Sequence, residues 1–184
     1  FGGFFAVYSY VAPLVTEGAG APQAVVPLVL IGMGLGMTVG NLLGGHLSDV
    51  NLRRTLLLGL AVLAVSLAVL ALTAAWIWAL AVMVFVVGAV SSALSPAIQT
   101  RLMDVAGDNQ SIAAALNHSA LNIGNSLGAA LGGAVIAAGW GFVAPPWVGA
   151  ALAAAGLAIA FTAYGVERRR GVPIVYAHSS TAAE

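Results

Sequence analysis

Six long apolar runs, separated by short polar breaks, constrain this 184-residue sequence more than any other feature. A helix needs about 20 mostly apolar residues to cross a bilayer, and these runs do not alternate as the strands of a membrane barrel would. Charged residues make up only 7% of the chain, whereas a soluble domain carries about 25%. We therefore predict an all-α polytopic membrane protein whose six transmembrane helices cover residues 1–16, 24–47, 55–73, 75–98, 110–139 and 147–166.

Arginine and tryptophan positions predict the orientation of these spans. All arginines follow even-numbered spans, and all tryptophans fall at the opposite ends, where interfacial aromatic residues are enriched. The positive-inside rule then places the arginine end in the cytoplasm. We expect a six-helix bundle over residues 1–166, with both ends of the segment cytoplasmic, and a short cytoplasmic tail over residues 167–184 in contact with lipid.

Several function classes are disfavoured by the sequence. The chain has no cysteine, no lysine and no net charge, so we expect neither a nucleic-acid partner nor a metal or other cofactor. The stretch 124–128, "GNSLG", matches the pattern of a serine nucleophile, but it lies inside a predicted helix rather than at a strand-to-helix turn. We therefore expect no enzyme. The opening "FGGFF" lacks an initiator Met, and we expect a piece of a longer protein.

Glycines form two rows at four-residue spacing, each along one side of a predicted helix. Small residues let membrane helices approach closely. Two interpretations stay open at this point: ordinary packing inside the six-helix unit, or contact with a second bundle. The rows contain Gly32, Gly36, Gly40 and Gly44 in the second span, and Gly124, Gly128 and Gly132 in the fifth.

Polar residues at membrane depth are costly and mark candidate functional sites. The fifth span has the densest set, namely Asn117, His118, Asn122 and Asn125. The last three are spaced to share one helical face. His118 is a candidate proton carrier, because histidine as a residue type changes charge near physiological pH. The alternative is that these side chains only hydrogen-bond to neighbouring helices.

The stretch "GGHLSDVNLRRTLL", residues 44–57, resembles the loop signature of the major facilitator superfamily between the second and third helices of each half. The matching residues are Gly45, Leu47, Asp49, Arg53 and Arg54, whereas Val50 and Leu52 depart from the pattern. Residues 99–133 further resemble the drug-efflux branch, which contains exporters of arabinose or chloramphenicol.

This resemblance implies the C-terminal half, helices seven to twelve, of a proton-coupled small-molecule efflux transporter in a prokaryotic inner membrane. Its partner would be the N-terminal half, and both glycine rows would pack across the interface between halves. The implied cavity residues are Tyr8, Tyr10, Ser91 and Ser92, with aromatic lipid contacts or carbonyl-bonded serines as alternatives. The implied cytoplasmic gate contains Gly45, Asp49, Arg53, Arg54, Arg101 and Asp104.

Two alternatives remain beside this reading. The gate aspartates, together with Asp108, are equally interpretable as helix caps. The whole chain is also compatible with a non-transporting six-helix membrane protein, such as a channel subunit or assembly factor that oligomerises through its glycine faces.

Overall fold

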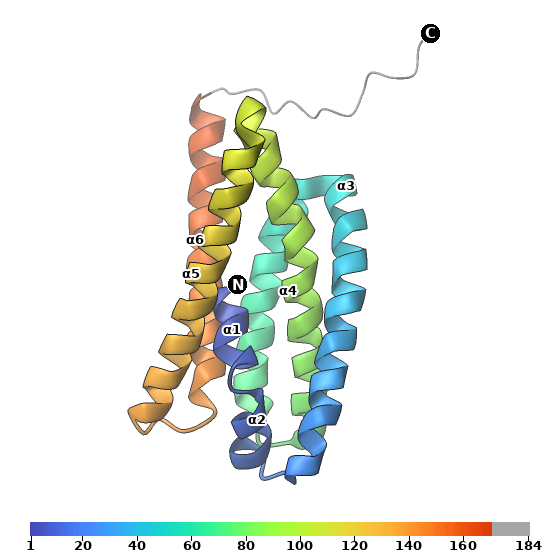
Figure 1. Cartoon of the computed structure of the whole chain (residues 1–184), viewed down its shortest axis with the longest axis vertical. Helices are drawn as coiled ribbons and strands as arrows, with labels where there is room; N and C mark the ends of the chain where they lie inside the picture. The colour runs from blue at the N-terminus through green and yellow to red at the C-terminus, as the bar shows by residue number, and fades with distance from the viewer. Residues whose placement is uncertain (171–184) are drawn as a thin grey trace.

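The computed structural model describes residues 1–170 and shows a bundle of helices aligned along one axis (Figure 1). Helices satisfy every backbone group within the segment, which an apolar surrounding demands. The described elements are α1 (Gly2–Tyr8), α2 (Val11–Pro13), the π-helical turn η1 (Leu14–Gly18), the 3₁₀ turn η2 (Gln23–Val25), α3 (Val26–Thr73), α4 (Ile77–Ala106), the 3₁₀ turn η3 (Gly107–Asn109), α5 (Gln110–Ala137) and α6 (Ala144–Arg170).

Helix α3 consists of two antiparallel limbs that meet at Asn51, whose backbone is extended (φ −159°, ψ 90°). The Asn51 Oδ1 atom accepts a hydrogen bond of 3.0 Å from the backbone N–H of Arg54, so Asn51 caps the second limb. The Thr55 hydroxyl donates to the carbonyl of Leu47, which ties the two limbs together. The expectation that Asp49 could supply this cap is wrong, because the capping geometry belongs to Asn51.

Three described segments are long and apolar enough to cross a membrane: Gln23–Thr73, Ile77–Ala137 and Ala144–Arg168. The first contains both limbs of α3, and the second contains α4 and α5 joined at Gly107, where φ is +53°. The kink of α3 and the ends of α4 and α6 lie at one end of the bundle (Figure 1). The segments that carry the described arginines therefore meet at this end, which we call the arginine end. The number of six membrane spans stays a prediction.

The first predicted span is shorter and less regular than expected. Helix α1 ends at Tyr8, and Pro13 is followed by a π-turn in which the N–H of Ala19 donates to the carbonyl of Leu14 over 3.0 Å. The N-terminus lies about half-way along the bundle in Figure 1. The broken helices from Gly2 to Gly18 do not extend to the arginine end. The prediction that both ends of the segment are cytoplasmic stays a prediction.

The glycine row of α3 packs against α4 within this unit. A Cβ atom added at Gly36, Gly40 or Gly44 would overlap backbone atoms of α4, which fill the groove. Those atoms belong to Phe85, Ala89 and Ala93 respectively. The prediction that these three glycines contact another half is wrong, because α4 occupies their surface. A Cβ at Gly32 meets nothing within 4 Å, so its assignment to an interface stays a prediction.

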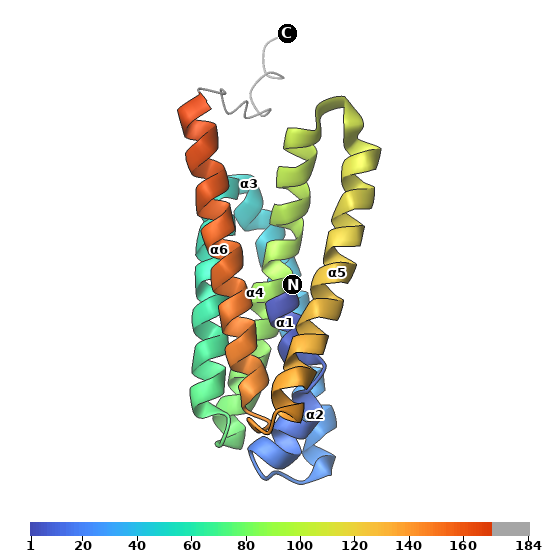
Figure 2. The ribbon, with the colours of Figure 1, turned by 90° about the vertical axis from the view of Figure 1, so that its left-hand side faces the viewer.

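The glycine row of α5 packs against α1, which lies beside both α5 and α6 (Figure 2). A Cβ at Gly128 would overlap the carbonyl of Gly2, and one at Gly132 would come within 3.0 Å of the Ala6 carbonyl oxygen. Both are therefore internal contacts, and their predicted place between two halves is wrong. Gly124 has only an ordinary contact, 3.6 Å from its added Cβ to the Gly2 nitrogen, and its interface role stays a prediction.

The sixth helix continues past the predicted boundary at residue 166. Helix α6 runs without a break through Glu167 to Arg170, so the first residues of the expected tail extend the helix. The rest of that tail, residues 171–184, lies outside the described residues.

Candidate functional site

The predicted polar residues of α5 lie in a segment that is long and apolar enough to cross a membrane. His118 and Asn122 are exposed, while Asn117 and Asn125 are half-buried. The Oδ1 atom of Asn125 is buried and has no hydrogen-bond partner among the described residues. Because α5 buries only Ala113, Gly128 and Gly132 in this bundle, most of its surface is free to meet another segment or a solute.

Two tyrosines of the first span have different environments. The Tyr8 side chain is 46% exposed, and its ring lies 5.4 Å from the Phe5 ring and 5.5 Å from the Phe4 ring. Tyr10 instead donates its hydroxyl to the Ala129 carbonyl of α5 over 2.8 Å. The predicted cavity role stays a prediction for Tyr8 and for the ring of Tyr10. The Tyr10 hydroxyl is already bonded, and it ties the segment between α1 and α2 to α5.

The two predicted serines of α4 are also distinguished by burial. Ser91 is only 3% exposed and sits inside the helix packing, so it cannot line an open cavity in this conformation. Ser92 is half-buried, and its contact with a solute stays a prediction.

At the arginine end, the structure joins three segments through one ion pair and one aromatic ring. Arg101 of α4 forms an ion pair with Glu167 of α6. The guanidinium carbons of Arg53 and Arg101 lie 5.1 and 5.2 Å from the centroid of the Tyr164 ring. Cations within about 6 Å of a ring centroid are attracted by the electron-rich ring face.

The predicted gate residues are only partly brought together there. The Arg101 guanidinium reaches Glu167, whereas Asp104 is exposed and its gate role stays a prediction. Asp49 and Arg54 are exposed as well, and Gly45 is half-buried with nothing within 4 Å of an added Cβ, so their gate role stays a prediction. Asp108 lies in η3, and Asn109 stands at the start of α5 without a side-chain capping bond.

Sequence reasoning missed both α6 partners in this cluster. The predicted boundary at residue 166 places Glu167 in the tail, and Tyr164 lies within the predicted apolar span without being distinguished from its neighbours. Their three-residue spacing places them on one helical face, and both fall at the end of the span that carries the arginines. The shared helical face and the shared position near the arginines could have predicted that both side chains contact an arginine.

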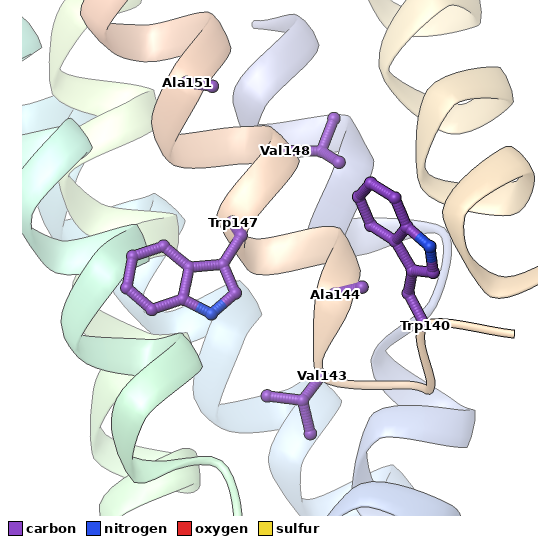
Figure 3. A pocket seen from close by; sticks show the side chains of 6 residues that line it. All are labelled: Trp140, Val143, Ala144, Trp147, Val148 and Ala151. Atoms are coloured by element: carbon purple, nitrogen blue, oxygen red, sulfur yellow. The ribbon is translucent and has the colours of Figure 1, made fainter. Parts of the chain in front are cut away.

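Two hollows lie near the opposite end of the bundle. One has a volume of about 510 Å³ and is walled almost entirely by apolar side chains (Figure 3), namely Trp140, Val143, Ala144, Trp147, Val148 and Ala151. Another, of about 660 Å³, is bordered by Glu17, Gln23 and Phe142. Within the described residues, no group of three histidine or carboxylate side chains is placed to hold a metal ion.

The family model for the Major Facilitator Superfamily matches residues 1–178. The chain belongs to this superfamily. Inner membrane transport protein YdhP of Escherichia coli K12 is 36% identical over 160 residues, which is 87% of this chain and 41% of that protein. The chloramphenicol resistance protein of Streptomyces lividans is 31% identical over 157 residues, 85% of this chain and 40% of that protein.

A more distant relative is a protein of Helicobacter pylori named probable sugar efflux transporter, 27% identical over 134 residues. These residues are 73% of this chain and 34% of that protein. The chain therefore spans about two-fifths or less of the length of these relatives. The predicted resemblance and the all-α polytopic membrane class are confirmed, and the superfamily consists of transporters rather than enzymes.

Proposed function

We propose that this chain is the C-terminal six-helix half of an inner-membrane transporter that exports a small organic solute by alternating access. The observation that carries the proposal is the open polar face of α5, with His118 and Asn122 exposed within a segment apolar enough to cross a membrane. Membrane helices rarely leave such groups facing lipid. If the N-terminal half lies opposite this face, the face would border the central solute pathway. Such a pathway is expected in transporters whose halves rock about a site near the middle of the membrane.

The α5 side chains supply the chemistry such a pathway needs. The amide of Asn122 both donates and accepts hydrogen bonds, and the exposed ring of Tyr8 offers an apolar face with a hydroxyl. His118 would bind and release the coupling proton, because an imidazole changes charge near physiological pH. The names of the Streptomyces and Helicobacter relatives support a small solute, such as an antibiotic or a sugar, as cargo.

The deciding experiment is export by the full-length protein from intact cells, measured over a solute panel with and without a protonophore. We expect at least one solute to be exported and its export to collapse with the proton gradient. Export that persists without the gradient would contradict proton coupling. Failure with every solute, at normal membrane abundance, would contradict the efflux assignment.

A matched pair of variants tests the proton role of His118. His118→Gln keeps hydrogen bonding but cannot titrate, so we expect at least a tenfold loss of gradient-driven export. Solute exchange without a gradient should survive, because exchange needs no net proton movement. Ser119→Ala is the control, since the neighbouring Ser119 hydroxyl is already bonded to the Ala115 carbonyl of its own helix. If His118→Gln and Ser119→Ala export the solute equally well when driven by the proton gradient, His118 does not carry the coupling proton.

A further inference from the structure

Glu17 carries a negative charge at the end of the bundle opposite the arginine end. The links between α2 and α3, between α3 and α4 and between α5 and α6 lie at this end (Figure 1), and Glu17 is their only charged residue. It lies in η1, before the apolar segment Gln23–Thr73 begins. Its exposed carboxylate forms no ion pair or hydrogen bond with any residue that the structure describes. No cation of this unit is therefore placed to neutralise it.

The Glu17 carboxylate borders the hollow of about 660 Å³ at this end. The wall of the hollow comes from α2, from η1, from the start of α3 and from the link between α5 and α6. It presents the amide of Gln23 and the ring of Phe142 on a largely aliphatic surface that includes the buried Val26. Sites for small ligands typically measure about 300–1,000 Å³ and combine apolar walls with a few polar groups, and this hollow has that character.

The turn that carries Glu17 is fixed to the core of the bundle. The N–H of Ala19 donates to the carbonyl of Leu14, and the N–H of Ala21 donates to the carbonyl of Val15, each over 3.0 Å. Leu14 and Val15 are almost fully buried. The backbone on both sides of Glu17 is thus held in place before any ligand arrives, which lowers the entropy lost on binding.

The chemistry of the wall favours one class of ligand. A carboxylate without a partner attracts a cation and repels an anion, and the face of an aromatic ring such as that of Phe142 also attracts cations. A divalent metal ion needs several oxygen ligands, whereas no described group of three histidine or carboxylate side chains could hold one. The aliphatic wall instead suits the apolar body of an organic cation.

We propose that this hollow binds an organic ammonium ion that carries a single positive charge. Glu17 pairs with the ammonium head, Phe142 offers it a ring face, and Val26 and Ala12 contact the apolar body. No residue of α5 lines the hollow, so this site is separate from the polar face of α5 that carries the proposed export pathway.

The test measures how far a permanently charged probe, benzyltrimethylammonium, protects a cysteine in the wall. Ala12 borders the hollow and is exposed. The chain has no cysteine, so Ala12→Cys in a full-length protein without other cysteines is a single reporter. The protein is held in lipid nanodiscs, which leave both membrane faces open to water. The rate of labelling by the uncharged N-ethylmaleimide is then measured against probe concentration.

With the probe at about four times its Kd, we expect the labelling rate of Ala12→Cys to fall about fivefold, since only the free protein reacts. Benzenesulfonate, an anion of similar size, should give no protection. Ala24→Cys is the control reporter, because Ala24 is exposed in the neighbouring turn η2 but does not border the hollow. Equal protection of both reporters, or equal protection by both probes, would overturn the proposal. An Ala12→Cys protein that the probe does not protect, or that never labels, would overturn it as well.

Glu17→Gln tests the charge at nearly constant size. We expect the half-protecting concentration of the probe to rise at least tenfold, because the charged partner is lost. Thr16→Ala is the matched control in the same turn, since the Thr16 hydroxyl is already bonded to the Ala12 carbonyl over 3.2 Å, and it should protect like the parent. Unchanged protection in Glu17→Gln, or an equal loss in Thr16→Ala, would refute the role of the carboxylate.

Phe142→Leu gives a second, smaller measurement at the ring. A cation over an exposed ring gains modest energy, so we expect the half-protecting concentration to rise about twofold to fivefold. None of these measurements requires transport. Protection as expected in a protein that exports nothing would leave this site standing and contradict only the proposed function, whereas export without protection would contradict only the site.

Discussion

Glycines line two helix contacts in this bundle, and the two contacts are built differently. Along the α3–α4 contact, Gly36, Gly40 and Gly44 each face backbone of α4, so the two main chains touch repeatedly. Along the α5–α1 contact, backbone meets backbone at Gly128, whereas Gly132 also receives the ring of Tyr10. The first contact is a continuous main-chain seam, and the second is partly filled by a side chain.

The difference indicates separate tasks for the two sides of the unit. The first limb of α3 and α4 form a closed scaffold in which a glycine cannot be enlarged without moving backbone. Helix α5 is attached over a shorter contact, and its polar face stays open. Under the proposed function, a rigid scaffold beside a helix with an open face would let this unit hold its shape while it meets a moving partner.

The largest expected effect is at the α3–α4 seam. Gly40→Leu places a branched side chain where even a Cβ atom would overlap the Ala89 backbone, so we expect a loss of about 3 kcal/mol of stability. The damage should appear as a lower Tm and less protein in the membrane, rather than as a selective loss of transport. Measurements on the purified full-length protein and on membranes distinguish the two.

Gly34→Leu is the matched control for this substitution. Gly34 lies in the same limb, and an added Cβ there meets nothing within 4 Å. We expect normal abundance and a Tm close to that of the parent. A Gly40→Leu protein as stable as Gly34→Leu would show that α4 does not fill the row.

A smaller effect is expected at the α5–α1 contact, where two alanine substitutions can be compared. A Cβ at Gly128 overlaps the Gly2 carbonyl, whereas one at Gly124 lies 3.6 Å from the nearest atom, an ordinary contact. Both substitutions gain the same helix propensity, so their difference isolates the contact. We expect Gly128→Ala to be about 1–2 kcal/mol less stable than Gly124→Ala in thermal unfolding; equal stability would contradict the contact.

Much of this architecture follows from the sequence, because lipid imposes simple rules on single helices. Hydropathy identified the apolar segments, and arginine placement identified the segment ends that meet in the structure. The loop signature at residues 44–57 led to the correct superfamily. Each of these signals resides in one segment and needs no knowledge of its neighbours.

Pairing between helices could not be predicted in the same way. The glycine row of α3 shows a surface for close approach, but nothing in the row distinguishes α4 from a helix of another half. Tyr10 illustrates the same gap, because its hydroxyl is bonded to a carbonyl 119 residues away in the chain. Such partners depend on the position and rotation of whole helices, which single-segment patterns do not contain.

Tyr10→Phe tests that hydroxyl and should have a modest effect. The substitution removes the bond to the Ala129 carbonyl but keeps the ring against Gly132, so we expect a loss of about 1 kcal/mol. Tyr8→Phe is the control, since Tyr8 is 46% exposed and the substitution keeps its ring contacts with Phe4 and Phe5, so its Tm should stay near that of the parent. If Tyr8→Phe lowered the Tm more than Tyr10→Phe, the hydroxyl that stabilises the bundle would be that of Tyr8, contrary to our conclusion.

The smallest effect on stability, and the clearest effect on function, is expected at Asn122 on the open face of α5. Asn122→Ala removes an exposed amide that supports no packing in this bundle, so stability should change by less than about 0.5 kcal/mol. If the amide contacts the exported solute, its loss raises KM by about fivefold to tenfold, the equivalent of one hydrogen bond. Ser119→Ala provides the comparison on the same helix, because that hydroxyl is bonded internally. A large drop in Tm for Asn122→Ala, with KM unchanged, would mean that this face packs against protein and carries no solute, and the contrast between a closed scaffold and an open helix would fail.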